Sequence, residues 1–245
     1  MAQQATLYRM VMDDHLCPFG LKAKHRLEAE GYEVDDHWLT TREETDAFRA
    51  EHGVETTPQV WIGDERVGGY DALRGWLGDD VKGADDTSYQ PVIAIFSVAA
   101  LLALAITWGM TGAVGLRTLE LFIALSMAIL AIQKLQDVES FSTMFLNYDL
   151  LARRWVPYAR IYPFGEALAG VLMAGAVLPW LSGPVALVIG TIGAVSVAKA
   201  VYVDKRALKC ACVGGGSKVP LGFVSLTENL MMMVMGLWVL GKMAV

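Results

Sequence analysis

Cys17-Pro18-Phe19-Gly20 separates a strand-like run, residues 5–11, from a helix-like run, residues 21–31. Side chains recur at roughly helical spacing after this stretch, which predicts that a helix begins close behind the cysteine. The positive end of a helix dipole favours the thiolate form of a cysteine placed at the helix N-terminus. The stretch therefore predicts a reactive thiol, Cys17, at a strand-to-helix junction.

The alternation of strand and helix patterns continues on both sides of this junction. Gly63-Asp64 joins two short apolar runs, which is typical of a β-hairpin. A βαβ unit followed by a ββα unit predicts an α/β domain over residues 1–78, with one central sheet flanked by helices. Residues 79–90 are rich in Asp and lack periodicity, so they are expected to be a linker. Strands are expected at 5–11, 32–39, 60–62 and 65–67, and helices at 21–31, 41–52 and 71–77.

The chain is strongly apolar beyond residue 90. A mean hydropathy of +0.40 and a hydrophobic content of 54% are too high for an ordinary soluble protein of 245 residues. Each apolar segment is close to the 20 residues that cross a bilayer core as a helix. Residues 91–245 are therefore expected to form an all-α bundle in the lipid bilayer, with about five spans at 91–110, 118–136, 161–180, 184–203 and 221–241.

Charge patterning predicts which side of the membrane the head faces. Residues 1–90 carry 19 acidic and 9 basic side chains without a basic–aromatic stripe, which excludes nucleic acid as a partner. The first 30 residues lack the apolar run of a signal peptide, so the head is expected to stay in the cytoplasm.

The basic residues of the apolar part predict the same orientation. The side opposite the head has Arg117 and Lys242. Nine basic residues lie in or beside the two loops assigned to the side of the head: Lys134, Arg153, Arg154, Arg160, Lys199, Lys205, Arg206, Lys209 and Lys218. This positive-inside bias predicts a multi-pass protein of the bacterial inner membrane, with residues 210–212 in the cytoplasm.

The connection between the second and third spans interleaves apolar and charged side chains. It is expected to be an amphipathic helix that lies against the inner leaflet. The residues Trp155, Tyr158 and Tyr162 are expected at the level of the lipid headgroups. The apolar positions of this helix are Phe141, Phe145, Leu146, Leu150, Leu151 and Trp155.

Cys210-Ala211-Cys212, followed by three glycines, lies between the last two spans. Three cysteines facing a reducing compartment do not indicate a disulfide scaffold, so these thiols are expected to be catalytic, redox-sensing or metal-binding. Cys210 and Cys212 can close a disulfide. They can equally present two sulfur ligands to a soft metal ion such as Hg(II) or Cu(I).

Three carboxylates lie within or at the edges of the expected spans, where an unpaired charge is costly and usually functional. Glu120 is expected to pair with Arg117. Glu166 is near enough to the membrane surface to reach water. Glu228, near the start of the last span, is the candidate intramembrane functional group.

Three motifs of the head resemble those of glutaredoxin, in the order and spacing of that family. They are Cys17-Pro18-Phe19-Gly20, Thr56-Thr57-Pro58-Gln59-Val60-Trp61-Ile62 and Gly68-Gly69-Tyr70-Asp71-Ala72-Leu73. The resemblance implies a thioredoxin-like fold, a reactive Cys17 and binding of glutathione. By position it implies that the bound tripeptide is contacted by Thr57, a cis-proline at Pro58, Gly69, Tyr70 and Asp71.

The sequence departs from the dithiol motif of that family at one position. Gly20 stands where the second cysteine would be. Cys17 then needs glutathione, or a thiol outside its own loop such as Cys210 or Cys212, to resolve a mixed disulfide.

The membrane part resembles the MauE/DoxX-like, redox-associated membrane proteins over residues 91–245. The motifs that carry the resemblance are the CxC with its three glycines, Pro220, Glu228 and Tyr162-Pro163-Phe164-Gly165-Glu166. The resemblance implies a role in the thiol oxidation state of partner proteins. A related pattern occurs fused to heavy-metal-binding domains, which keeps a metal function open.

Two functions follow as hypotheses. The first is a glutathione-linked thiol–disulfide oxidoreductase, in which Cys17 exchanges thiols with Cys210 and Cys212 and Glu228 accepts a proton or positions a helix. The alternative is a soft-metal transporter, in which Cys210 and Cys212 receive Hg(II) or Cu(I) and the head removes the ion. A third interpretation is a non-catalytic assembly factor.

Overall fold

The computed structural model describes residues 3–13, 15–81, 83, 86–211 and 219–244. The chain divides into two compact units, Met1–Ala84 and Asp85–Val245. The division falls within the expected linker, and each unit is described by itself.

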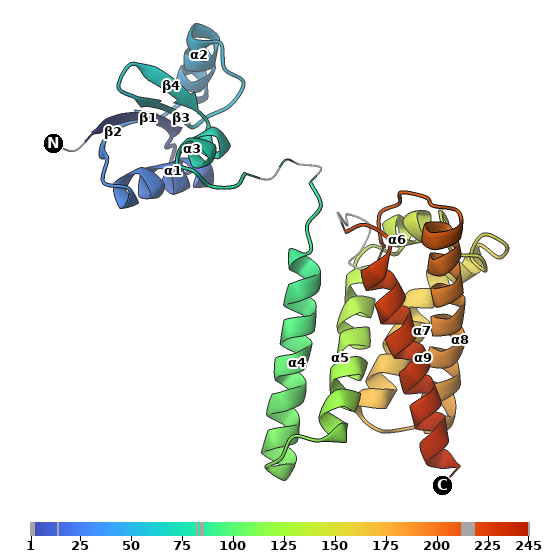
Figure 1. Cartoon of the computed structure of the whole chain (residues 1–245). Helices are drawn as coiled ribbons and strands as arrows, with labels where there is room; N and C mark the ends of the chain where they lie inside the picture. The colour runs from blue at the N-terminus through green and yellow to red at the C-terminus, as the bar shows by residue number, and fades with distance from the viewer. Residues whose placement is uncertain (1–2, 14, 82, 84–85, 212–218, 245) are drawn as a thin grey trace. The chain divides into compact units, whose positions relative to one another are not determined.

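The first unit is a four-stranded mixed sheet with helices on both faces (Figure 1). β1 is parallel to β2 and antiparallel to β3, and β3 is antiparallel to β4. The strands are β1 (Gln4–Met10), β2 (Glu33–Leu39), β3 (Gln59–Ile62) and β4 (Glu65–Gly68), in the order β2-β1-β3-β4. The helices are α1 (Pro18–Ala29), α2 (Arg42–His52) and α3 (Tyr70–Trp76). Each element predicted from the sequence of the head is present, and the arrangement is the expected thioredoxin-like fold.

Alternation along β1 explains how the two faces of the sheet are covered. Leu7 is fully buried on the face that carries α1 and α3, in a cluster with Ala5, Ala23, Leu27, Val60, Ile62 and Leu73. Tyr8 points to the opposite face, because consecutive side chains of a strand alternate. There its ring stacks on Phe48 of α2, with the ring centroids 4.7 Å apart.

The second unit is the expected all-α bundle. Its helices are α4 (Gln90–Thr111), α5 (Leu116–Leu135), α6 (Val138–Phe145), α7 (Pro157–Ala174), α8 (Pro179–Ala198) and α9 (Phe223–Met243). A π-helical turn, η1 (Lys199–Val203), continues α8. In the bundle α5 packs on α7, α7 on α8 and α8 on α9, while α4 lies at the edge against α5 (Figure 1).

Among the described residues four helices are long and apolar enough to cross a membrane, where the sequence predicted about five. They are α4, α5, α8 with η1, and α9. The expected third span corresponds to α7, which runs beside these helices in the bundle. Arg160, Pro163 and Glu166 make α7 less apolar, so its composition alone does not mark it as a span.

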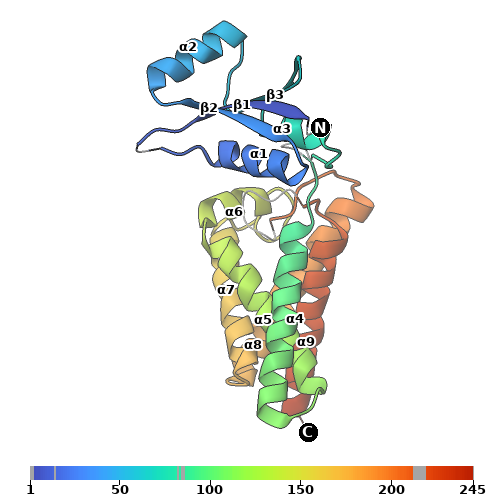
Figure 2. The ribbon, with the colours of Figure 1, turned by 90° about the vertical axis from the view of Figure 1, so that its left-hand side faces the viewer.

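One end of the bundle collects the start of α4, the short helix α6 and the start of α9, as Figures 1 and 2 show from two directions. Lys209 and Pro220 pair through an isolated β-bridge. This bridge brings together the two described ends of the CxC loop. The C-terminal end of α9 lies at the opposite end of the bundle (Figure 1).

The connection between α5 and α7 corrects the expectation of an amphipathic helix on the membrane surface. α6 has only eight residues and turns follow it. Phe141 and Phe145 are buried against Tyr162, with ring centroids 6.0 and 4.8 Å from that ring. Tyr158 and Tyr162 are buried as well, and of the three predicted headgroup residues Trp155 alone is exposed. Hydrophobic periodicity cannot distinguish a face that meets lipid from a face that covers the end of a bundle.

Candidate functional site

Cys17 lies at the N-terminus of α1, where the sequence predicted it. It is the N-cap residue, and Pro18 begins the helix. The Cys17 backbone N–H donates to the carbonyl of Met10 at 3.3 Å, which ties the residue to the end of β1. The thiol is free and the residue is 6% exposed. The position combines a helix N-terminus with shielding from water.

A groove of about 410 Å³ lies beside this helix start. The Thr57–Pro58 peptide bond is cis, as the resemblance implied. Asp71 lies in the first turn of α3, whose N-cap is Gly69. The groove is lined by Phe19, Thr56, Thr57, Pro58, Gly69, Tyr70, Asp71 and Ala72, which include all five residues assigned to glutathione. The structure therefore gathers these residues around one groove, while their contact with glutathione stays a prediction.

Arg9 explains why position 20 holds a glycine. A Cβ on Gly20 would lie 2.7 Å from the Cβ of Arg9 on β1. Two hydrogen bonds of 2.8 Å to Asp36 hold the Arg9 guanidinium in place, and Lys24 donates a third to Asp36 at 3.0 Å. Burial raises the pKa of Asp36, but the hydrogen bonds, led by those from Arg9, outweigh it and hold that pKa well below its usual range. The second cysteine of a dithiol motif would have no room here.

Gly20→Ala is expected to destabilise the head by about 1–3 kcal/mol, because the added methyl group collides with a side chain that cannot move away. Urea unfolding of the fragment 1–84, which has its own core, measures the effect. Gly75→Ala is the matched control, since its Cβ would meet nothing nearer than 4.0 Å. Equal stability of the two variants would contradict the steric explanation.

Cys210 lies in the second unit, where its side chain is shielded from solvent. The residue is 1% exposed and is disulfide-bonded. Ser225, in the first turn of α9, donates a hydrogen bond from Oγ to Cys210 Sγ at 2.9 Å. The Cys210 N–H donates to the carbonyl of Val219 at 2.7 Å, which closes the base of the loop. Cys212, the other cysteine of the motif, lies outside the described residues.

Three charged side chains from three helices meet inside the bundle. Lys134 of α5 donates from Nζ to both carboxylate oxygens of Glu166 on α7, at 2.7 and 2.6 Å. The same Nζ donates to Oε1 of Glu228 on α9 at 2.7 Å. All three side chains are buried. We call Lys134, Glu166 and Glu228 the ion cluster.

A void of about 20 Å³ is lined by Cys210 and by two members of the ion cluster, Lys134 and Glu228. A void of this size can hold one water molecule. Asn229 Oδ1 is buried beside it and has no hydrogen-bond partner among the described residues. The void is lined by Lys134, Phe141, Phe145, Tyr148, Tyr162, Gly193, Cys210, Ser225, Glu228 and Asn229.

The sequence did not predict the ion cluster. Lys134 was counted as a loop charge and Glu166 as a residue that reaches water, and both expectations were wrong. Glu228 is buried in α9, and its role stays a prediction. The signal that could have predicted the ion pair is that charges of opposite sign, Lys134 and Glu166, lie near the ends of two expected spans. The sequence interpretation placed each charge at the nearest membrane surface and did not pair them.

Further titratable groups surround the site outside the long helices. Burial raises the pKa of Tyr148, and the neighbouring Glu228 carboxylate raises it further, so this phenol stays neutral. Asp149 is buried and accepts from Ser196 Oγ at 3.1 Å and from the Ala152 N–H at 2.8 Å. Burial raises the pKa of Asp149 despite these hydrogen bonds. The interior at this end of the bundle is therefore polar but shielded from water.

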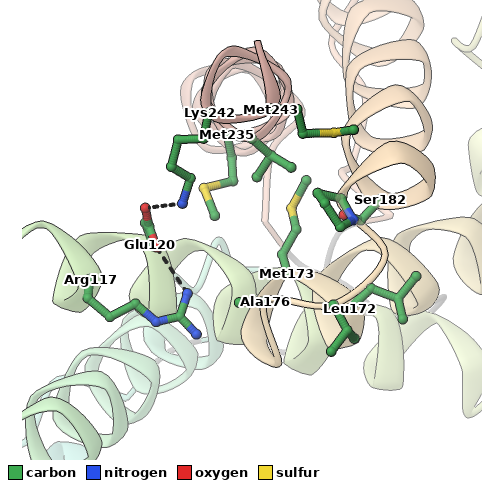
Figure 3. A pocket seen from close by; sticks show the side chains of 12 residues that line it. Arg117, Glu120, Leu172, Met173, Ala176, Ser182, Met235, Lys242 and Met243 are labelled. Carbon is green, nitrogen blue, oxygen red and sulfur yellow. Dashed lines mark hydrogen bonds and ion pairs between the residues drawn. The ribbon is translucent and has the colours of Figure 1, made fainter. Parts of the chain in front are cut away.

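A different polar group lies at the other end of the bundle (Figure 3). Glu120 accepts from Arg117 at 3.0 Å, which confirms the expected pair. It also accepts from Lys242 and Trp238 of α9, both at 2.6 Å. A cavity of about 170 Å³ with largely apolar walls adjoins it. Glu120 joins α5 to α9 here, and its charge is balanced by groups that lie partly exposed.

Comparison with known families supports the division of the chain. The model of Glutaredoxin matches residues 5–67, and the model of Methylamine utilisation protein MauE matches residues 94–242. The second match covers more than half of the chain. The chain belongs to the MauE family. The MauE match includes the ion cluster and Cys210, while searches of curated proteins and of solved structures find no significant match.

The fused architecture predicted from the sequence is thus confirmed. A glutaredoxin-like head precedes a MauE domain, and the apolar helices of the MauE domain make the chain a multi-pass membrane protein. The two domains together indicate a membrane-associated, redox-related protein.

Proposed function

We propose that this protein is a thiol–disulfide oxidoreductase of the bacterial inner membrane. Cys17 of the glutaredoxin-like head exchanges thiols with Cys210 and Cys212 of the MauE domain. The observation that carries the proposal is that one chain holds a free cysteine at a helix N-terminus and a disulfide-bonded cysteine. A thiolate and a disulfide are the two reactants of thiol–disulfide exchange.

Glutathione is the small thiol that the head is proposed to use. The groove offers a carboxylate, Asp71, at the start of α3, which suits the free amino group at the γ-glutamyl end of the tripeptide. Thr57 and Pro58 would form the wall along the peptide, and Gly69 and Tyr70 would contact its γ-glutamyl end. Bound there, glutathione supplies the sulfur that resolves a mixed disulfide at Cys17.

The end of the bundle that carries Cys210 is proposed to face the cytoplasm, with the head. Lys134 is buried in the bundle and therefore does not count as a loop charge. Eight basic residues of the sequence then remain in or beside the loops on the proposed cytoplasmic side, against Arg117 and Lys242 on the other side. Both residues on the sparse side are bound to Glu120. Without Lys134, the positive-inside bias therefore still supports this orientation.

Trapping the exchange intermediate tests the proposal. In a Cys210→Ser variant of the full chain, glutathione disulfide is expected to convert Cys17 to a mixed disulfide with glutathione. Cys212 thiolate then attacks the Cys17 sulfur, the bond between the Cys17 and Cys212 sulfurs forms, and glutathione leaves as thiolate. No neighbouring cysteine remains to break this bond. Mass spectrometry of a non-reduced protease digest should show the two peptides linked.

The controls separate this function from its alternatives. Cys17→Ser in the same background should show no linked peptide. The soft-metal alternative expects about one Hg(II) or Cu(I) bound per wild-type chain under reducing conditions, together with ion-dependent uptake. Uptake without any linked peptide would refute the redox proposal. Over the ranges that the structure describes, no group of three or more His, Cys, Asp or Glu could hold a metal ion.

A further inference from the structure

We infer that the ion cluster carries the proton for the membrane disulfide, exchanging it with Cys210 across the void that Cys210, Lys134 and Glu228 line. The inference rests on the proposed thiol–disulfide exchange and extends it from electrons to protons. Glu228 lines the void and exchanges the proton with Cys210, Glu166 is the second carboxylate that shares this proton, and Lys134 holds both in place.

The burial of Cys210 creates the need for an internal proton. With the residue 1% exposed, we propose that an incoming thiol attacks the other sulfur of the disulfide. We assign that sulfur to Cys212, because Cys17 is free and the sequence has three cysteines. Cys210 is then the leaving group and receives the electron pair as a thiolate. A thiolate shielded from water is costly, because burial disfavours the charged form. Its protonation has to come from a group inside the bundle.

Atoms and electrons balance with glutathione as the reductant. Glutathione thiolate attacks the Cys212 sulfur, its bond to that sulfur forms, and the bond to Cys210 breaks. A protonated carboxyl of the ion cluster gives its proton to the Cys210 thiolate. A second glutathione thiolate releases glutathione disulfide and leaves Cys212 as a thiolate. The two protons lost by the glutathione thiols return to Cys212 and to the ion cluster, so two glutathione thiols reduce one protein disulfide to two thiols.

The composition of the ion cluster suits this step. One lysine and two carboxylates bear a net negative charge if all are ionised, and they have a net charge of zero if the carboxylates share one proton. Buried groups of like charge share protons for this reason. The Lys134 Nζ lies 2.6–2.7 Å from both carboxylates, so it stabilises whichever one is ionised after the transfer.

A short route joins the ion cluster to the sulfur. Ser225 and Glu228 are three residues apart on α9 and therefore lie on one face of that helix. Ser225 Oγ already donates to Cys210 Sγ at 2.9 Å. Asn229 Oδ1 is buried beside the void and has no partner in the described part of the chain, so it can accept a hydrogen bond from a water molecule placed there. The hydroxyls of Tyr148 and Tyr162 complete the polar lining.

Kinetics of the full chain in lipid nanodiscs test the inference. Glutathione reduces the protein, glutathione disulfide reoxidises it, and alkylation followed by mass spectrometry counts free Cys210. Glu228→Gln and Glu166→Gln are expected to slow both directions about 10²-fold, the scale of losing a positioned proton carrier. The equilibrium with glutathione should not shift, because the disulfide and the two thiols are both neutral. A purely structural disturbance would instead shift this equilibrium, because it would change the stabilities of the disulfide form and the dithiol form by different amounts.

Glu120→Gln is the matched control. It removes one carboxylate from the same bundle, hydrogen-bonded to a lysine, at the end remote from Cys210. Its rates should equal those of the wild type. Wild-type rates in both Glu228→Gln and Glu166→Gln would overturn the inference while leaving the proposed function intact. A wild-type disulfide that does not exchange with glutathione in either direction would overturn both.

A measurement on the wild type keeps the inference testable if the glutamine variants do not fold. Rates corrected for thiolate concentration should be lower in D₂O than in H₂O for the exchange at Cys210. Exchange at Cys17 in the fragment 1–84 is the reference, since the ion cluster is absent from it. Equal isotope effects at the two sites would contradict an internal proton transfer.

Discussion

Lys134→Met is expected to destabilise the membrane domain by about 3–5 kcal/mol, which is the cost of removing one partner from a buried ion pair. The substitution leaves Glu166 and Glu228 buried without the cation that bonds to both of them. Methionine has a similar length and is apolar, so the loss comes from the two carboxylates and not from a cavity. The midpoint of thermal unfolding of the purified full chain, followed by tryptophan fluorescence in one detergent, measures the change.

Two further variants make this prediction specific. Lys242→Met also removes a lysine bound to a membrane carboxylate, but its side chain is 46% exposed, so the loss should stay within about 1 kcal/mol. Combining Lys134→Met with Glu166→Gln and Glu228→Gln removes all three charges and should recover most of the stability. Equal midpoints for Lys134→Met and Lys242→Met would show that the ion cluster is not buried as described.

The head could be predicted because its signals are local and agree with one another. Gly31 and Gly63 have positive φ angles of 83° and 60°, which glycine adopts readily and which mark the end of a helix and the turn of a hairpin. Thr41 accepts a hydrogen bond from the Glu44 N–H at 3.1 Å, as expected of a helix cap. The reason for Gly20 could not be predicted, since it depends on Arg9 across the sheet.

The membrane domain was harder to predict because its decisive contacts are remote in sequence. Lys134 is 32 residues from Glu166 and 94 from Glu228. Hydropathy treats a charge near the end of an apolar run as a boundary, and only the packing of α5, α7 and α9 brings the three side chains together. The aromatic residues Phe141 and Phe145 were assigned to lipid for the same reason. Periodicity shows that a helix has an apolar face but not what that face contacts.

Cys17→Ser is expected to abolish glutathione-linked activity of the fragment 1–84. A serine hydroxyl does not ionise in the accessible pH range and cannot form a mixed disulfide, so no residual pathway is available within the head. The free thiol of Cys17 is the one cysteine in this fragment, and Gly20 excludes a substitute beside it. Reduction of a glutathione mixed disulfide, coupled to glutathione reductase, measures the activity.

The control for Cys17→Ser lies in the other half of the chain. Cys210→Ser in the full-length protein should leave the activity of the head unchanged, because the head reaction needs only Cys17 and glutathione. The same variant, oxidised by glutathione disulfide without added glutathione, should instead accumulate the peptide that links Cys17 to Cys212. Undiminished turnover by the Cys17→Ser fragment would refute the role of this cysteine. Lost turnover in Cys210→Ser would instead show that the head cannot complete its cycle without the membrane cysteines, because a monothiol head has no resolving sulfur of its own.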